Sequence, residues 1–385
     1  RLFRERRYEE AADEYLQVIN SFPESDDAPR VLSNLGVCWA NLNRTLHVKM
    51  LVDYLAERFA GNDRAALGLL AAGKIYFDRG EAAMYQRIYD AYIDQFPEHD
   101  RVPAVLYSLS IARDKAGDTR GSRAYLDRII ERYPRSQYSL RALNRMAWDL
   151  YDKQNYGKAA ERFAQYIELS QPGPDVAKAQ FALADSRLRS EQYLVALREY
   201  LELKKWISQE DTPYAVSEED VAANRGLLEK ADFYIPYCLS KIDEPADKVP
   251  QFREQALAAY DRFISEYSDS RLAPRAMSAK GGIQLELGRY DAATDTFDEL
   301  ARRYPETEDG RSARYALIKA AMEVERFDIA RDAFQEMLSE SGRYEPQQFV
   351  QIGERMMENE LYDEALAAYA HVRESGTEER RLLER

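Results

Sequence analysis

Hydrophobic and aromatic residues recur along the chain at helical spacing. An aromatic residue is followed by alanine three positions later and by another aromatic residue four positions after that. The triplet occurs as Tyr8, Ala11, Tyr15; Tyr156, Ala159, Phe163; Tyr193, Ala196, Tyr200; Tyr290, Ala293, Phe297; Phe327, Ala330, Phe334; and Tyr362, Ala365, Tyr369. Steps of three, four and seven residues place these side chains on one face of an α-helix, not on a strand. The pattern predicts an all-α chain.

The triplet also keeps a fixed period. Its first position, here called the leading position, falls at 8, 45, 82, 119, 156, 193, 253, 290, 327 and 362. Five steps of 37 residues are followed by one of 60, two of 37 and one of 35. A sustained period of this size is typical of a solenoid. We therefore expect about ten units, with 23 extra residues in the long step.

Turn-forming residues divide each unit into a helix A and a helix B. Proline is expected in the first turn of helix A, where its missing N–H costs nothing, at Pro29, Pro103, Pro274 and Pro346. Serine is expected as the N-cap of helix A, at Ser25, Ser136 and Ser270. Glycine fits the turn between helix A and helix B, at Gly80, Gly117 and Gly288. Each unit is thus predicted as helix, turn, helix, turn.

Helix A has a column of small residues that allows close approach of a neighbouring helix. Its members are Gly36, Gly73, Ser110, Ala147, Ala184, Gly281 and Gly353, with Ile318 as the exception. The aromatic residues of helix B are expected to pack in the core, which accounts for most of the 27 tyrosines.

Charge and composition exclude several classes of protein. The net charge is −14 and the isoelectric point is near 5.0, which argues against a nucleic-acid-binding surface. No apolar run has the roughly 18 to 20 residues of a membrane span. Two cysteines, Cys38 and Cys238, exclude a disulfide scaffold and a cysteine-based zinc cluster. We expect both to be small core residues.

These residues resemble the tetratricopeptide repeat family over nearly the whole chain. Units closed by an aromatic residue and proline, as at Tyr133-Pro134 and Tyr304-Pro305, are similar to an envelope subgroup of that family. This subgroup includes the outer-membrane barrel-assembly lipoprotein and the periplasmic coordinator of the Tol–Pal system. The resemblance implies a right-handed superhelical solenoid whose helix A residues line the concave side. It also implies location in the periplasm or cell envelope of a bacterium, with the cytoplasm as the alternative.

The long step divides the predicted solenoid. We expect an N-terminal array at 1–208, an insertion with longer helices and loops at 209–252, a C-terminal array at 253–373 and a frayed tail at 374–385. Within the insertion, a loop is predicted at 208–220, a helix at 221–242 with a bend near Pro236, and a second loop at 243–250. The insertion is either a tolerated loop or a partner-contacting spur or hinge. Because the chain begins at Arg1 within a helix B, its first unit is expected to be incomplete, with further sequence beyond both ends.

The sequence shows little sign of catalysis. His47, His99 and His371 fall in different units, which a solenoid keeps apart, so no metal site is predicted. No HExxH, paired CxxC, GxGxxG or phosphate-loop motif is present. We predict no cofactor and no enzymatic activity.

Side chains on the groove side of helix A are the candidate site. Exposed aromatic residues beside amides and arginines suit peptide binding. The predicted groove residues are Asn34, Asn41, Lys74, Tyr107, Arg141, Asn144, Arg145, Trp148, Tyr151, Phe181 and Asp185. The alternative is that Trp148 and Phe181 only complete the packing between helices.

One subtype of the family binds a peptide carboxylate with lysine, asparagine and arginine on three successive helices A. Arg141 and Arg145 match its basic pair, but Leu70, Lys74 and Ser108 stand where lysine, asparagine and asparagine are required. The clamp is therefore broken, and a looser anion site of Lys74, Arg141 and Arg145 for an acidic peptide end is the remaining expectation.

We therefore expect a non-enzymatic scaffold that binds a protein or peptide in its groove, without nucleic acid or membrane insertion. The alternative is a structural or homo-oligomerising module of a larger envelope assembly protein.

Overall fold

The computed structural model describes residues 1–209 and 212–375, and within these residues it contains helices and no strands. The helices labelled with even numbers are the predicted helices A. They are α2 (Ala28–Asn41), α4 (Asp63–Asp78), α6 (Val102–Lys115), α8 (Gln137–Asp152), α10 (Pro174–Arg189), α12 (Glu218–Lys241), α14 (Ala273–Glu286), α16 (Glu308–Glu323) and α18 (Pro346–Glu358).

The helices labelled with odd numbers are the predicted helices B. They are α1 (Tyr8–Ser21), α3 (Thr45–Arg58), α5 (Ala82–Gln95), α7 (Thr119–Arg132), α9 (Tyr156–Leu169), α11 (Tyr193–Ile207), α13 (Val249–Glu266), α15 (Tyr290–Arg303), α17 (Phe327–Ser339) and α19 (Tyr362–Ser375). Nine of these helices begin at the leading position, which confirms the register read from the sequence.

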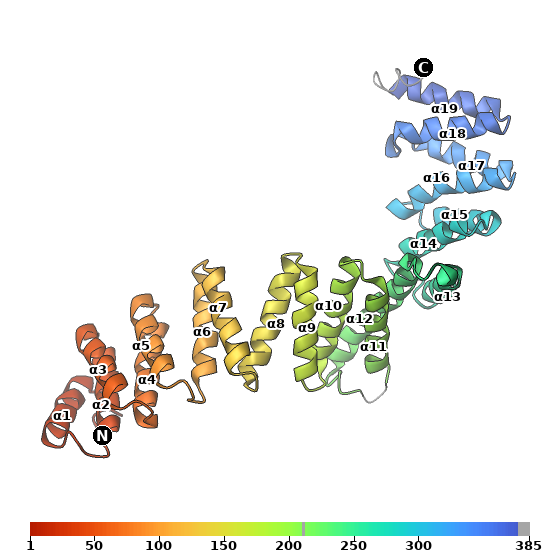
Figure 1. Cartoon of the computed structure of the whole chain (residues 1–385). Helices are drawn as coiled ribbons and strands as arrows, with labels where there is room; N and C mark the ends of the chain where they lie inside the picture. The colour runs from red at the N-terminus through yellow and green to blue at the C-terminus, as the bar shows by residue number, and fades with distance from the viewer. Residues whose placement is uncertain (210–211, 376–385) are drawn as a thin grey trace. The chain divides into compact units, whose positions relative to one another are not determined.

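The chain forms two compact units, residues 1–149 and 150–385. Within each unit, sequential helices pack side by side as pairs (Figure 1). Several even-numbered helices also contact the next even-numbered helix, as α2 does with α4 and α10 does with α12. The predicted all-α solenoid of helix pairs is confirmed. The division at 208 and 253 stays a prediction, and the predicted frayed tail lies outside the described residues apart from the last turn of α19.

The small-residue column of helix A is explained by contact with helix B. A Cβ atom added to Gly73 would lie 2.4 Å from Tyr89 Cε1, and one added to Gly353 would lie 2.7 Å from Tyr369 Cε1. A real Cβ atom cannot approach a ring this closely, so glycine is required unless the ring moves. The column therefore fixes how closely the two helices of a unit pack.

The turn between helix A and helix B adopts the left-handed conformation. Gly80, Gly117 and Gly288 have φ values of 74°, 80° and 69°, as the turn prediction requires. The same turn position is non-glycine, with φ between 56° and 61°, at Arg6, Asn43, Gln154, Glu191, Glu325 and Glu360. In the turn after α4, the N–H of Glu81 donates to the carbonyl of Tyr76 at 3.0 Å, closing the helix as in a Schellman motif.

The predicted helix starts are confirmed in part. The prolines stand at the first or second position of α2, α6, α14 and α18. Ser136 Oγ accepts a hydrogen bond from the N–H of Tyr138 at 3.0 Å at the start of α8. In the turn just before α14, Ser270 Oγ accepts a hydrogen bond from the N–H of Leu272 at 3.0 Å. The prediction for Ser25 was wrong, because Asp27 occupies the N-cap of α2 and makes no side-chain cap.

The lengthened seventh unit follows its prediction closely. The predicted helix 221–242 is α12, which begins three residues earlier because Ser217 Oγ caps it by accepting from the N–H of Asp220. Pro236 lies inside α12 and is buried. The second predicted loop is shorter, since a short 3-10 helix, η1 (Ala246–Lys248), leads directly into α13. A second 3-10 helix, η2 (Ser341–Arg343), follows α17.

Candidate functional site

The predicted groove residues all lie on even-numbered helices, but they divide between the two units. Eight are in the 1–149 unit: Asn34, Asn41, Lys74, Tyr107, Arg141, Asn144, Arg145 and Trp148. Three are in the 150–385 unit: Tyr151, Phe181 and Asp185. The two sets are therefore two candidate surfaces, and each is described separately.

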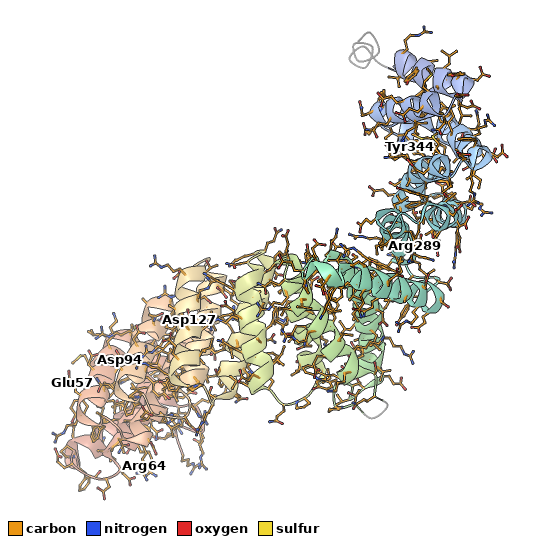
Figure 2. All side chains as sticks on the ribbon, turned by 45° about the vertical axis from the view of Figure 1, so that its right-hand side comes forward. Glu57, Arg64, Asp94, Asp127, Arg289 and Tyr344 are labelled. Atoms are coloured by element: carbon orange, nitrogen blue, oxygen red, sulfur yellow. The ribbon has the colours of Figure 1, made fainter. Side chains whose placement is uncertain are left out.

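In the first repeats, only part of the predicted set faces open space. Asn34 lines a cavity of about 250 Å³ between α2 and α4, together with Arg30 and Arg64 (Figure 2 labels Arg64). Asn41 Nδ2 instead donates to the carbonyl of Val37 on its own helix at 2.8 Å. The Lys74 ammonium pairs with both carboxylate oxygens of Asp78 at 2.9 Å. Asn34 is thus placed for ligand contact, whereas the other two side chains are engaged within their helices.

Between α6 and α8, arginines lie over tyrosine rings. The Arg141 guanidinium is 5.1 Å from the ring centre of Tyr138, and that of Arg145 is 5.9 Å from the ring centre of Tyr107. Arg145 also forms an ion pair with Asp114. Such stacking and pairing hold both guanidiniums in place.

The predicted anion site of Lys74, Arg141 and Arg145 does not present three cations that all lack a carboxylate partner. Lys74 and Arg145 each already hold a carboxylate, so an incoming anion would have to displace it. Asn144 is half-buried, and its Oδ1 has no hydrogen-bond partner among the described residues. Trp148 is 38% exposed on α8.

In the 150–385 unit, the half-buried Tyr151 and the exposed Arg189 form a polar cluster around the buried Asp185. The Tyr151 hydroxyl donates to Asp185 Oδ2 at 2.5 Å, and Arg189 Nε donates to the same oxygen at 2.6 Å. Asp185 is only 3% exposed, so its carboxylate depends on these donors for compensation. Burial, together with the hydrogen bond to Asp185, raises the pKa of Tyr151. The sequence singled out Tyr151 and Asp185 but missed Arg189.

A cavity of about 410 Å³ lies beside this cluster, mainly between α10, α12 and α14. Its lining residues are Asp185, Leu188, Arg189, Glu191, Tyr193, Phe233, Tyr234, Tyr237 and Arg275. The Arg275 guanidinium stacks 5.9 Å from the ring centre of Phe233. The cavity thus combines aromatic walls with hydrogen-bond donors, as a peptide site needs.

Phe181 belongs to the packing beneath this cavity. Its ring contacts the edge of Tyr200 with a centroid separation of 5.6 Å, and Tyr234 stacks on the same Tyr200 at 5.6 Å. Tyr200 is fully buried, so the three rings join α10, α11 and α12. For Phe181, the structure favours the alternative in which the residue completes interhelix packing.

The histidines and cysteines occupy separate structural positions. His47 packs on Trp39, the His99 ring hydrogen-bonds the Tyr92 hydroxyl at 2.8 Å, and His371 packs on Phe349. Among the described residues, no group of histidine, cysteine and acidic side chains could hold a metal ion.

Both cysteines are fully buried, as the sequence predicted. Burial raises the pKa of Cys38 to about 11 and that of Cys238 to about 12, which makes both thiols poor nucleophiles at neutral pH.

Within the part of the chain that the structure describes, none of the helices combines the length and apolarity needed to cross a bilayer.

The solved structures that resemble the chain include the following two. PilF from Pseudomonas aeruginosa is 14% identical, with a TM-score of 0.33 and coverage of 66% of this chain and 97% of its own. The C-terminal part of a TPR repeat-containing protein from Cytophaga hutchinsonii is 16% identical, with a TM-score of 0.36 and coverage of 71% and 96%. No curated protein matches the sequence.

Two family models described as tetratricopeptide repeat match parts of the chain. One matches residues 144–209 and 251–307, and the other matches residues 104–136. The interval between the first two stretches falls on the lengthened seventh unit. These matches, together with the helix pairs in register, support the tetratricopeptide repeat family for this chain.

Proposed function

We propose that the chain is a non-catalytic scaffold whose helix A side chains in the 150–385 unit bind a peptide. The observation that carries the proposal is the 410 Å³ cavity, in which Arg275 lies over the Phe233 ring and forms no ion pair with any described residue. The carboxylate of Asp309 on α16 interacts with Arg275 only through its charge. Arg189 in the same cavity is already held by Asp185. Arg275 is therefore the cation available to a ligand.

The chemistry of the cavity favours a peptide that carries both a carboxylate and an aromatic or apolar side chain. A guanidinium binds a carboxylate through two parallel N–H donors, and the faces of Tyr234 and Tyr237 supply stacking surface. Glu191 at the rim opposes a second acidic group there, so one carboxylate beside one ring fits best. An acidic peptide end, as expected from the sequence, has this composition.

Two parts of the sequence-based expectation remain proposals beside this one. A role in an envelope assembly protein and location in a bacterial periplasm rest on the resemblance of the aromatic-proline units. The Asn34 cavity and the arginine–tyrosine pairs of the 1–149 unit remain a second candidate surface for a protein partner.

Reversing the charge of Arg275 should weaken peptide binding. In fluorescence anisotropy with labelled dodecapeptides that end in Phe-Asp, Arg275→Glu is expected to raise the Kd at least tenfold, or about 1.4 kcal/mol. The physical reason is loss of the charge-assisted hydrogen bonds at Arg275, the cation of the cavity that has no carboxylate within ion-pair distance among the described residues.

Arg302→Glu is the matched control, because Arg302 is exposed on α15 and its one ion pair among the described residues is with Asp298 on its own helix. A peptide with an amidated, uncharged end should bind wild type and Arg275→Glu equally. Equal affinity of both charge reversals for the acidic peptide would contradict the assignment of this cavity.

A further inference from the structure

Helix α3 has an exposed apolar ridge that the other helices B lack. Leu46, Met50 and Tyr54 are spaced by four residues, so they form one row along the helix, and they are 69%, 66% and 45% exposed. We call these three residues the α3 ridge. Solvent-facing rows of this kind are normally polar, and a contiguous apolar patch marks an interaction surface.

The repeat supplies its own comparison for this ridge. The three ridge positions, one, five and nine residues after the leading position, are Asp291, Asp295 and Glu299 in α15 and Asp328, Asp332 and Glu336 in α17. In the nine other helices B, Leu194 is the single large apolar residue at any of these positions. The fold therefore does not require apolar residues there, and the α3 ridge needs another explanation.

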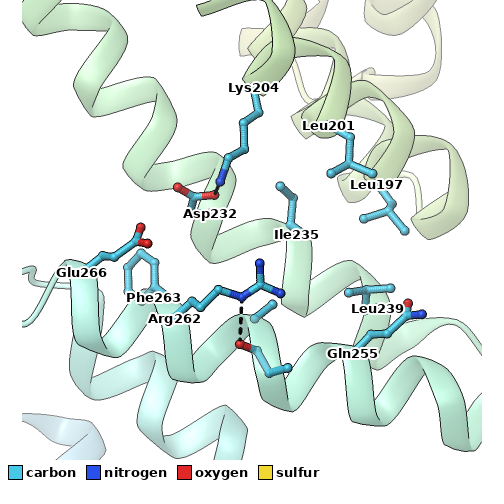
Figure 3. A pocket seen from close by; sticks show the side chains of 12 residues that line it. Leu197, Leu201, Lys204, Asp232, Ile235, Leu239, Gln255, Arg262, Phe263 and Glu266 are labelled. Carbon is cyan, nitrogen blue, oxygen red and sulfur yellow. Dashed lines mark hydrogen bonds and ion pairs between the residues drawn. The ribbon is translucent and has the colours of Figure 1, made fainter. Parts of the chain in front are cut away.

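A second departure from the repeat opens a groove in the other unit. A cavity of about 490 Å³ lies between α11, α12 and α13 (Figure 3). Its apolar surface comes from Leu197, Leu201, Ile235, Leu239 and Phe263, and we call it the α11–α13 groove. Leu201 is 49% exposed, so this surface is open to solvent.

A short side chain on α13 keeps the groove open. Ala258 stands at the middle ridge position, which six other helices B fill with a charged residue: Asp13, Arg87, Glu161, Arg198, Asp295 and Asp332. Alanine leaves the apolar wall uncovered, where a long charged side chain would lie across it. The seventh unit thus presents a hollow at a position that six other units cover with a charged side chain, while α7 and α19 also have alanine there.

Charged side chains border the groove. Arg262 lines the groove, and its one hydrogen bond among the described residues is to the carbonyl of Ala258 on its own helix, at 3.3 Å (Figure 3). Glu266 stands one turn further along α13. Lys204 and Asp232 neutralise each other across the groove at 2.5 Å. The groove therefore offers one cation and one anion to an incoming helix.

The border of the α3 ridge carries one charge that matches the groove. Lys49 and Glu57 lie in the row beside the ridge, and both are exposed at the surface (Figure 2 labels Glu57). Between them, Asp53 is held by Arg87 at 2.7 Å. A helix lying in the groove can place its Glu57 beside Arg262, which gives one ion pair across the contact.

We propose that the α3 ridge of one copy of this chain docks into the α11–α13 groove of a second copy. The contact joins two different surfaces, so it is heterologous, and repeated contacts give either a closed ring or an open chain of copies. Large apolar side chains fill the hollow over Ala258, and the pair of Glu57 with Arg262 borders the contact. This interface uses odd-numbered helices and α12, and it is independent of the peptide cavity.

Complementation between two variants tests the interface. In sedimentation velocity between about 1 µM and about 1 mM, the wild-type chain should form concentration-dependent oligomers. Met50→Lys removes the ridge and Ala258→Arg fills the groove, so each variant alone should sediment as a monomer. An equimolar mixture should form a 1:1 dimer, because each variant supplies the surface that the other lacks.

Controls separate this result from misfolding and from other interfaces. Both substituted residues are exposed, so far-ultraviolet circular dichroism should remain that of the wild type. Ala124→Arg places the same change at the same repeat position of α7 and should leave self-association unchanged. A wild-type monomer throughout the range, oligomers of either single variant, or a mixture that stays monomeric would each overturn the proposal.

Discussion

Replacing Gly281 by alanine should destabilise the chain by about 1–2 kcal/mol, although alanine is the better helix former. An added Cβ at Gly281 would lie 2.6 Å from both Cε1 and Cζ of Phe297, whose ring is buried between α14 and α15. Overpacking of a closed core costs about 1–3 kcal/mol. The gain in helix propensity of about 1 kcal/mol offsets only part of this cost. Urea denaturation followed by circular dichroism measures the net effect.

The next residue gives a control of opposite sign. Gly282 lies in the same helix turn, but a Cβ added there would meet nothing within 4 Å. Gly282→Ala should therefore stabilise the chain by up to about 1 kcal/mol, through propensity alone. If both alanine variants shift the urea midpoint in the same direction, the close approach of helices A and B is not what selects glycine at 281.

The leading position shows how far the sequence determines the fold. A period of 37 residues locates the first residue of nine helices B, because each unit repeats the same packing against its neighbour. The exception is α13, which begins at Val249, four residues before the leading position Arg253. The start of α13 is set by η1 and by Pro250 in the first turn of the helix. The other helices B have no counterpart of these residues.

The turn position illustrates a limit of residue-type rules. Glycine marks the left-handed turn at Gly80, but Glu191 and Glu325 adopt the same conformation. A non-glycine residue pays about 1 kcal/mol or more for a left-handed backbone, which the packing of the two flanking helices outweighs. Only the repeat register, and not the residue type, predicts these turns.

The candidate site was less predictable than the fold because it depends on pairs of charges. The pair of Lys74 with Asp78, four residues apart on one helix, follows from sequence spacing. The pair of Arg145 with Asp114 joins two helices and spans 31 residues, a separation that many of the 68 acidic residues share with some arginine. Arg275 was missed because the lengthened α12 interrupts the register between it and the earlier groove residues.

Truncation of Tyr260 should have the largest effect on stability of any change considered for this chain. Its side chain is fully buried on α13, and its ring packs against Phe233 with centroids 6.4 Å apart. Tyr260→Ala is expected to cost about 3–5 kcal/mol in the free energy of unfolding, as measured in urea. Since each repeat contacts only its neighbours, the loss should appear first in the transition of the 150–385 unit.

Tyr260→Phe should have the reverse effect. The Tyr260 hydroxyl has no hydrogen-bond partner among the described residues, so its removal should be neutral or stabilise the chain by up to about 1 kcal/mol. Tyr304→Phe is the control, because the Tyr304 hydroxyl donates to the carbonyl of Ser268 at 2.8 Å and its loss should cost about 1 kcal/mol. Equal effects of the two phenylalanine variants would show that the Tyr260 hydroxyl is satisfied.

Tyr260→Phe should also change how the free energy of unfolding depends on pH in the alkaline range. Burial raises the pKa of Tyr260, so the hydroxyl stays protonated in the folded chain at a pH where the unfolded chain ionises. Tyr260 therefore contributes its full stability below about pH 10, and that contribution is lost as the pH rises above this value. Tyr260→Phe removes this proton linkage, so its free energy of unfolding should fall less steeply than that of the wild type above pH 10. Parallel curves for the two proteins would mean that Tyr260 ionises equally in both states, and hence that water reaches its hydroxyl.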